Sequence, residues 1–534
     1  MPNLRMSAAR RQTRERAGRS PPPTRGLRAA LAGPAGSRTQ ISAIRRTSSP
    51  PRGERCSVSD GFDRAASSHH VFRHPPDAAL EAAGLTLRVR AIEGRFIQTV
   101  KSRGDGIGLA STRSEWECDI ATAAPDLLRL GSVPQLVAMI GDLARGLEPM
   151  FITDVQRRIR TVSLDGGCTV EVAIDEGRIE TGDRSEPICE LELELKTGSP
   201  GPMYRFASIL QATAPMWLSS ESKATRGWRL RTGQTAAIRL ATTPLLDNGA
   251  DAADGFRQIV RAALGHLIAN IGPTLRGDPE GLHQMRIALR AARAALQLFE
   301  PMLDHPVIAR FDGDLQTACR AFGATRDWDV FFLETLPAAM RALPSARLRD
   351  LVPAAERARK RSHRTVEHLV RGPHFTEMLL ALAAWAEQTP DGVRGDTAAL
   401  AHHSLATLAP DLLACVAHKT RKRGRHVTRL SPDRLHRFRK ALDRLCNDCT
   451  ALGALFPQHR LSIYHARCVT LQDILGAAND AVVAEGIAVT LAERPDLVAP
   501  VEELLGWSKA RRAEALTGLR SATHDFRSAE PFWT

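Results

Sequence analysis

The sequence predicts an α+β chain, with an antiparallel barrel or tunnel in its first half, an all-α duplicated helical bundle in its second, and a disordered N-terminal tail. Three observations support this prediction. Polar and apolar residues alternate with a period of two between residues 84 and 196, His and Arg recur at helical spacing after residue 251, and charge is distributed unevenly. Because 534 residues exceed one ordinary core, we expect two or three domains.

The first 75 residues form a segment of their own, with 15 Arg, no Lys and four acidic residues, a net charge of +11. They show no sustained apolar period, so they cannot bury enough surface to offset the entropy of ordering. We therefore predict that residues 1–75 are disordered or, because Lys is absent, a mis-translated stretch of GC-rich DNA. A transit peptide and a basic nucleic-acid-binding tail are the alternatives.

The next segment reads as strands. Leu85 to Arg90 alternates apolar with polar residues, Glu93-Gly94 marks a turn, and Arg95 to Lys101 continues the pattern, which predicts a β-hairpin. Later, Ile188 to Lys196 places three Glu and one Lys on one face. For any single strand, a solvated outer face is the better explanation of such charges.

Repetition of these charged faces argues for an interior site. Carboxylates massed on neighbouring strands repel each other unless a cation lies between them. Guanidinium and ammonium groups massed in the same way call for an anion such as phosphate. A closed barrel with both sets inside would hold a phosphate chain together with its divalent metal.

Five linked motifs between residues 76 and about 240 carry a resemblance to a known family: LTLRVRAIEGRFIQTVKSRG, TRSEWE, VEVAID, SEPICELELELKTG and ESKATRGW. Together they resemble the CYTH domain of inorganic triphosphatases, thiamine triphosphatases and one class of adenylate cyclase. The resemblance implies a tunnel-like antiparallel barrel over residues 76–245, which binds triphosphate on Arg and Lys and Mg²⁺ or Mn²⁺ on Glu.

The same resemblance assigns roles to individual residues. The implied phosphate-binding residues are Arg88, Arg90, Lys101, Arg158 and Lys223. Of the two neighbours Arg157 and Arg158, we choose Arg158. The implied catalytic residues are Glu115, Glu117 and Glu192, and the implied metal ligands are Glu190, Glu192 and Glu194. Glu171 and Asp175 are further members of the acidic set.

One element of the family is missing from the sequence. The family opens with a strand patterned Glu-x-Glu-x-Lys, but residues 1–75 contain two Glu and no Lys. Either the chain lost its first strand and helix, or its start is mis-assigned. In both cases we expect an open barrel edge, an incomplete metal shell and impaired activity.

The second half of the chain has helical periodicity. His283, Arg286, Arg290 and Arg293 follow one another at steps of three, four and three, which places them on one stripe of a helix. A charged stripe is usually the solvated side of an amphipathic helix, but this one is purely basic. The His-x-x-Arg start recurs at His436 and Arg439, about 153 residues later, which indicates a duplicated unit.

These motifs resemble the CHAD domain, an α-helical module of two repeats that binds inorganic polyphosphate. The resemblance covers residues 251–524 and is weaker in the second repeat, where Asp443, Cys446 and Asn447 replace the family's Lys, Arg and Tyr. The implied polyphosphate-binding residues are His283, Arg286, Arg290, Arg293, Lys419, Lys422, His436 and Arg439.

These observations lead to one expected function and one alternative. We expect an inorganic triphosphatase, a hydrolase acting on phosphoanhydride bonds, with inorganic triphosphate and polyphosphate as its partners. The alternative is a non-catalytic polyphosphate-binding protein with an incomplete barrel. Nucleic acid is disfavoured because only 25 residues are aromatic. Nine Cys without a secretory signal favour a cytoplasmic location. The sequence contains no run of eighteen uncharged apolar residues, so we expect no transmembrane helix and no membrane partner.

Overall fold

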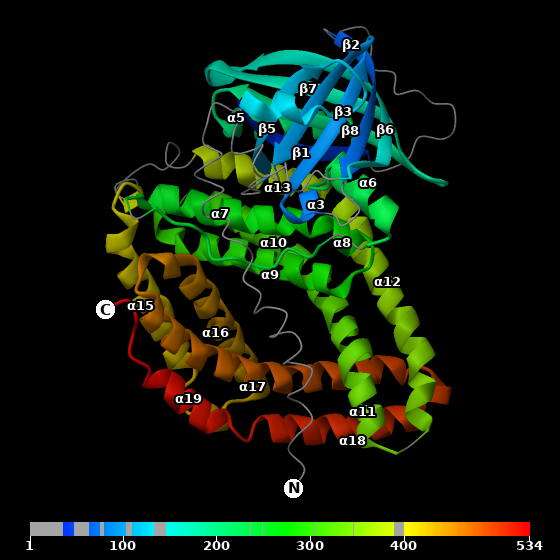
Figure 1. Cartoon of the computed structure of the whole chain (residues 1–534). Coiled ribbons are helices and arrows are strands. Elements are labelled where there is room, and N and C mark those ends of the chain that lie inside the picture. Colours follow the sequence, from blue (N-terminus) through cyan, green and yellow to red (C-terminus); the bar gives the residue numbers. More distant parts are fainter. Residues whose placement is uncertain are drawn as a thin grey trace.

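The computed structural model describes residues 36–46, 64–74, 79–102, 109–132, 146–234, 237–247, 249–303, 305–344, 346–388 and 400–534. In this part of the chain a β-barrel lies against one side of a larger helical domain (Figure 1). The predicted order, a barrel followed by helices, is therefore confirmed.

The barrel is an antiparallel sheet closed on itself. Its strands are β1 (Gly36–Arg46), β2 (Arg64–His74), β3 (Leu85–Ile92), β4 (Arg95–Ser102), β5 (Ala110–Ile120), β6 (Glu148–Leu164), β7 (Cys168–Thr181), β8 (Arg184–Thr197) and the short β9 (Met216–Leu218). Seven of them pair in the order β5-β4-β3-β2-β6-β7-β8, and β1 pairs with both edge strands, β8 and β5. Closure leaves both edges of the seven-stranded sheet paired.

Strand β1 corrects two expectations for the N-terminal segment. Residues 1–75 are not uniformly without structure, because Gly36–Arg46 and Arg64–His74 are strands. A first strand is also present, since the backbone of β1 is paired on both sides. Its sequence, GSRTQISAIRR, contains neither Glu nor Lys, so only the Glu-x-Glu-x-Lys pattern is missing. Residues 1–35 and 47–63 lie outside the described part of the chain.

The predicted hairpin is confirmed as β3 and β4. Ile92 pairs with Arg95 across a two-residue turn, Glu93-Gly94, in which both residues have positive φ, 48° and 77°. Such turns match the right-handed twist of the strands, and Gly adopts the conformation without strain. This register sets Lys101 opposite Thr86 and Thr99 opposite Arg88.

Two helices connect the barrel with its surroundings. In α5 (Pro200–Thr213), Met203 and Ala207 belong to one apolar core with Val172 and Leu193 of the barrel and with the helices that follow. In α6 (Lys223–Thr232), Trp228 packs on a separate cluster that contains Phe151. The barrel and the helical domain therefore share a continuous core.

The helical domain comprises α7 (Ala252–Ala269), α8 (Ile271–Leu275), α9 (Pro279–Leu298), α10 (His305–Val330), α11 (Leu336–Ala342), α12 (Leu351–Arg371), α13 (Pro373–Gln388), α15 (Leu405–Arg423), α16 (Pro432–Leu452), α17 (Gln458–Leu491), α18 (Val498–Ala515) and α19 (Leu519–Arg527). The two predicted repeat starts fall on α9 and α16, each of which begins with Pro in its first turn. These two helices pack against each other, so the repeats meet at their basic helices.

Helix α17 alone among the described residues is long and apolar enough to cross a membrane by length and composition. An 18-residue window has a mean hydropathy of 1.5, and 39% of that window is buried. The helix contains no run of eighteen uncharged residues, because charged side chains such as Asp473, Asp480 and Glu485 interrupt it. In the structure, α17 packs against α16, α18 and α19, which are the contacts of a helix within a bundle.

Candidate functional site

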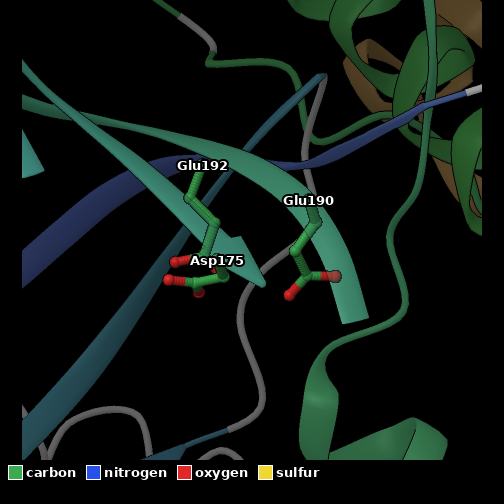
Figure 2. A group of neighbouring side chains, drawn as sticks. All are labelled: Asp175, Glu190 and Glu192. Atoms are coloured by element: carbon green, nitrogen blue, oxygen red, sulfur yellow. The ribbon is translucent and has the colours of Figure 1, made fainter. Parts of the chain in front are cut away.

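Three carboxylates from two neighbouring strands meet inside the barrel. Asp175 on β7 pairs in register with Glu190 on β8, and Glu192 lies two residues farther along the same face of β8. One carboxylate oxygen from each lies within 4.8 Å of the others, and the three groups point toward the same space (Figure 2). Asp175 and Glu190 are buried, with exposed fractions of 0% and 4%. Such a group is stable only if cations accompany it.

Lys223 provides the first of these cations. Ser222 caps α6 by accepting a hydrogen bond from the Thr225 amide, so that Lys223 begins the helix. Its Nζ lies 2.6 Å from Asp175 Oδ2 and 2.9 Å from Glu192 Oε1, and it also pairs with Glu190. Burial alone would lower the pKa of Lys223, but attraction to the three carboxylates outweighs burial and raises the pKa.

Arg157 on β6 provides the second cation. Its Nε donates to Asp175 Oδ1 at 2.7 Å, and its Nη2 donates to Glu192 Oε2 at 2.7 Å. Burial opposes its charge, but Glu192 and Asp175 raise the pKa of Arg157 well above its ordinary value. We call Asp175, Glu190, Glu192, Arg157 and Lys223 the barrel cluster; it contains three negative and two positive side chains.

A second charged set lines strands β3, β4 and β5. Lys101 Nζ lies 2.7 Å from Glu115 Oε1, and Arg88 Nη2 lies 3.6 Å from the same oxygen. Arg90 Nη2 lies 3.4 Å from Glu117 Oε1. Burial, only partly offset by Glu115, lowers the pKa of Arg88 to about 10. The five predicted residues Arg88, Arg90, Lys101, Glu115 and Glu117 therefore lie together, with each cation next to a carboxylate.

His70 on β2 connects the two sets and was not identified from the sequence. The Ser68 hydroxyl lies 2.7 Å from its Nε2, and Arg88 Nη1 lies 3.3 Å from its Nδ1. Burial and then the charges of Arg88, Arg90, Arg157 and Lys223 lower the pKa of His70 well below its ordinary value. A neutral imidazole thus lies within electrostatic range of cations from both sets. The sequence could have indicated it, because His70 alternates along the strand with Ser68 and Phe72 and therefore lies on the same buried face.

Two predicted site residues lie elsewhere. Arg158 pairs with Glu176 at 3.0 Å, whereas its neighbour Arg157 contacts the clustered carboxylates, so the structure brings Arg157 rather than Arg158 to this cluster. Glu194 contacts Lys196 at 2.8 Å, and Lys196 also reaches Glu171, so Asp175 takes the place expected for Glu194 among the clustered carboxylates. Adjacent residues of a strand face opposite sides, so the register of β6 against β7 was needed to choose Arg157.

In the helical domain, the predicted stripe is only partly brought together. Arg290 on α9 and Arg439 on α16 share the carboxylate of Asp443, at 3.0 Å and 3.2 Å. Burial and then Arg290 lower the pKa of Arg286, which also lies within range of Arg439. Asp443, where the resemblance leads us to expect Lys, thus joins the two repeats.

The remaining predicted residues of this surface are distributed around α9, α10, α15 and α16. The pKa of His283 is lowered by burial and then by Arg326, and that of His436 by burial and then by Lys440. Arg293 is engaged by Asp312 through two hydrogen bonds of 3.0 Å. Lys419 and Lys422 are exposed near the C-terminal end of α15. Within the described residues, neither Lys shares a carboxylate with the stripe in the way that Arg439 does.

Comparison with known proteins gives two family matches. A model described as "CYTH domain" matches residues 68–228, and one described as "CHAD domain" matches residues 258–489. The chain is also 29% identical over 160 residues to the inorganic triphosphatase of Haemophilus influenzae. That match covers 30% of this chain and 44% of the relative, so the chain spans less than half of the relative's length.

Solved structures give weaker likenesses. The CHAD domain from the plant Ricinus communis is 25% identical, with a TM-score of 0.49, and the match covers 54% of this chain and 97% of that one. PptA from Streptomyces chartreusis is 18% identical, with a TM-score of 0.39, covering 52% and 100%. Both TM-scores lie below 0.5, so the assignment rests on the family models and the curated relative. The chain contains a CYTH domain at residues 68–228 followed by a CHAD domain at residues 258–489, and is a distant homologue of inorganic triphosphatase.

Proposed function

We propose that the barrel binds inorganic triphosphate together with a divalent cation, Mg²⁺ or Mn²⁺, and hydrolyses a phosphoanhydride bond. The observation that carries this proposal is the barrel cluster, where three carboxylates converge on the ammonium of Lys223. Carboxylate oxygens at this spacing suit a hard divalent cation. The similarity to an inorganic triphosphatase supports the substrate class.

The residues of the barrel would divide the work between them. Asp175, Glu190 and Glu192 would hold the cation, which would supply charge neutralisation at the phosphate oxygens and an acidified water. Lys223 and Arg157 already contact these carboxylates and would turn toward the phosphates when a cation replaces them. Arg88, Arg90 and Lys101 would bind the rest of the phosphate chain, and Glu115 and Glu117 would keep these cations in place.

The composition of β1 favours a specific second candidate. Because Gly36–Arg46 has no Glu or Lys, this chain lacks the family's first acidic and basic positions although its barrel is closed. A barrel of this kind would bind phosphate chains without rapid turnover. The second candidate is therefore a non-catalytic polyphosphate-binding protein, in which the helical domain binds polyphosphate through Arg286, Arg290 and Arg439.

A cytoplasmic location completes the proposal. The eight cysteines within the described residues are all free thiols, as expected for a reducing compartment.

Phosphate release tests the two candidates. The full chain would be assayed with inorganic triphosphate, ATP and thiamine triphosphate, with Mg²⁺ or Mn²⁺ and with a chelator. We expect metal-dependent release from inorganic triphosphate, and a loss of at least about 100-fold in Glu192→Gln, since it removes a charge that acts on the metal and on two cations.

Glu176→Gln is the matched control, because Glu176 follows Asp175 in the sequence but pairs with Arg158 outside the cluster. It should keep wild-type turnover. Triphosphate binding without metal-dependent release in the wild type would favour the non-catalytic candidate. Absence of both binding and release would reject the proposal for the barrel.

A further inference from the structure

The C-terminal end of α15 borders a basic cavity that is separate from the stripe on α9 and α16. The cavity has a volume of about 920 Å³ and is bounded by the end of α15, the turn that follows it, and α19. Six lining residues carry a fixed positive charge: Arg421, Lys422, Arg425, Arg429, Arg520 and Arg527. No carboxylate is among the lining residues. We call this cavity the C-terminal pocket.

These six cations are not neutralised by the protein. Among the described residues, none of them forms an ion pair with a carboxylate, although Arg421 donates to the Ala529 carbonyl at 2.8 Å. Cations at the end of α15 are favoured by its dipole, which explains Arg421 and Lys422. The dipole argument fails for Arg520, which lies in the first turn of α19 where a cation is unfavourable.

Two buried polar atoms of the pocket also lack a partner among the described residues. The Thr523 side chain is 3% exposed, and its Oγ1 has no hydrogen bond, whereas Thr420 on α15 bonds the carbonyl of Val416 in the usual way. Arg421 Nε is likewise buried and unpaired. A buried hydroxyl and a buried guanidinium N–H without partners are costly unless a ligand or a water molecule in the cavity satisfies them.

The turn that carries Arg425 is held firmly against α16. A Cβ at Gly424 would lie 2.6 Å from the ring of Phe438, so only glycine allows this approach. His426, two residues after Gly424, adopts a left-handed conformation with φ of 52°, which is uncommon for a residue other than glycine. The cations on the turn are therefore positioned by the backbone before any ligand arrives.

We propose that the C-terminal pocket is a second anion-binding site, which takes a compact, multiply phosphorylated anion without a base. Six unmatched charges around one cavity require an anion of high charge, and single phosphates would leave most of them unmatched. No Phe, Tyr or Trp lines the cavity, and its aromatic rings are the small imidazoles of His418, His426 and His524, so the lining offers charge rather than a large surface for stacking. The site is independent of the hydrolysis proposed for the barrel. Its ligand is either a short inorganic phosphate chain or a phosphorylated cyclic polyol.

Calorimetric titration of the full chain, with chelator present, tests this site. The probes are inorganic triphosphate and inositol hexakisphosphate, used with wild type, the double variant Lys422→Glu/Arg520→Glu, and Arg423→Glu. Arg423 is the matched control, because it is exposed, follows Lys422 and does not line the cavity. We expect the double variant to weaken binding of at least one probe by about tenfold or more, since each lost contact involves a charged donor. The control should bind as the wild type does.

The more tightly bound probe then identifies the source, either a linear chain or a cyclic polyol. Thr523→Val keeps the shape of the side chain and should weaken the same binding step a few fold, about 1 kcal/mol. It guards against a double variant that fails to fold. Equal affinity of wild type, the double variant and Thr523→Val for both probes would overturn the proposal, as would an equal loss in Arg423→Glu.

Discussion

The barrel cluster and the C-terminal pocket both collect cations, but only the barrel supplies carboxylates to match them. Lys223 alone contacts three acidic side chains, and Arg157 contacts two of the same three. In the pocket, no ion pair to a carboxylate is formed by the six cations among the described residues. Two cations with three carboxylates in the barrel cluster, and six cations without a carboxylate in the pocket, therefore produce two different electrostatic situations within one chain.

The difference determines what each site can bind. A matched site can exchange one of its own cations for a metal ion and then offer that cation to a phosphate, so it suits a ligand that arrives with a metal. An unmatched site can only gain an anion, and its affinity should fall steeply with added salt. The following predictions alter this balance, beginning with the largest expected effect.

Removing the central cation of the barrel should have the largest effect. Lys223→Met removes the one cation that contacts all three carboxylates, and leaves Asp175 and Glu192 with Arg157 and Glu190 with Arg226. Breaking a buried charge pair costs about 3–5 kcal/mol. Urea unfolding at neutral pH would measure this loss. Because the three carboxylates then have one cation fewer, Mn²⁺ should raise the melting temperature of the variant more than that of the wild type.

Lys196→Met is the control, since Lys196 also contacts two Glu of the barrel but is 35% exposed. It should lose about 1 kcal/mol or less. If the two variants lost the same stability, or if Mn²⁺ protected them equally, the matched character of the barrel cluster would be wrong.

Acid and base should destabilise the two domains in opposite ways. Burial raises the pKa of Asp448 in α16 to about 8, with Arg444 3.6 Å away only partly offsetting it. Its folded pKa lies above the unfolded one, so its contribution to stability is complete in acid and is lost as pH rises from about 4 to about 8, by about 1.4 kcal/mol per pH unit. His70 in the barrel has a lowered pKa, so its contribution is present above about 6.5 and is lost as pH falls.

Asp448→Asn should therefore raise the free energy of unfolding at pH 7.5 and leave it nearly unchanged at pH 4. In His70→Gln, the free energy of unfolding should no longer fall below pH 6 in the way that it does in the wild type. Urea titrations of both variants across this range would measure the two slopes. Slopes of the same sign, or no change of slope in either variant, would contradict the assigned environments.

Close packing of α6 on the barrel gives the next prediction. A Cβ at Gly227 would lie 2.2 Å from the ring of Phe151, so Gly227→Ala must displace α6 or the ring. Such overpacking costs about 1–3 kcal/mol. Displacement of α6 would also move Lys223, so hydrolysis should fall with stability.

The control lies in the helical domain. Nothing lies within 4 Å of a Cβ added at Gly323 in α10, so Gly323→Ala should gain about 0.5–1 kcal/mol from helix propensity. Thermal unfolding and phosphate release distinguish the two variants. An unchanged melting temperature in Gly227→Ala would show that α6 is not held against the barrel in this way.

The sequence was sufficient for what depends on periodicity. Alternation identified the hairpin around Glu93-Gly94, and helical spacing identified α9 and α16 as equivalent helices. The sequence was not sufficient where the pairing of strands determines the position of a residue. Strand β1 has little apolar alternation and takes its place from its neighbours β5 and β8, and the choice of Arg157 over Arg158 needed the register of β6. In both cases the missing information was long-range.

Asp443 offers the smallest and most direct change to the comparison, because it is the carboxylate that partly matches the cations of the α9–α16 surface. Asp443→Asn frees Arg290 and Arg439 from their shared partner. We expect a loss of at most about 1 kcal/mol in stability and a gain of similar size in polyphosphate affinity, with a steeper salt dependence. Asp312→Asn, which frees Arg293 alone, is the matched control and should gain less. Titrations with long-chain polyphosphate at two salt concentrations would measure both effects. A weaker affinity in Asp443→Asn would mean that Asp443 orients the two guanidinium groups. In that case this surface, like the barrel cluster, would need its carboxylate for binding.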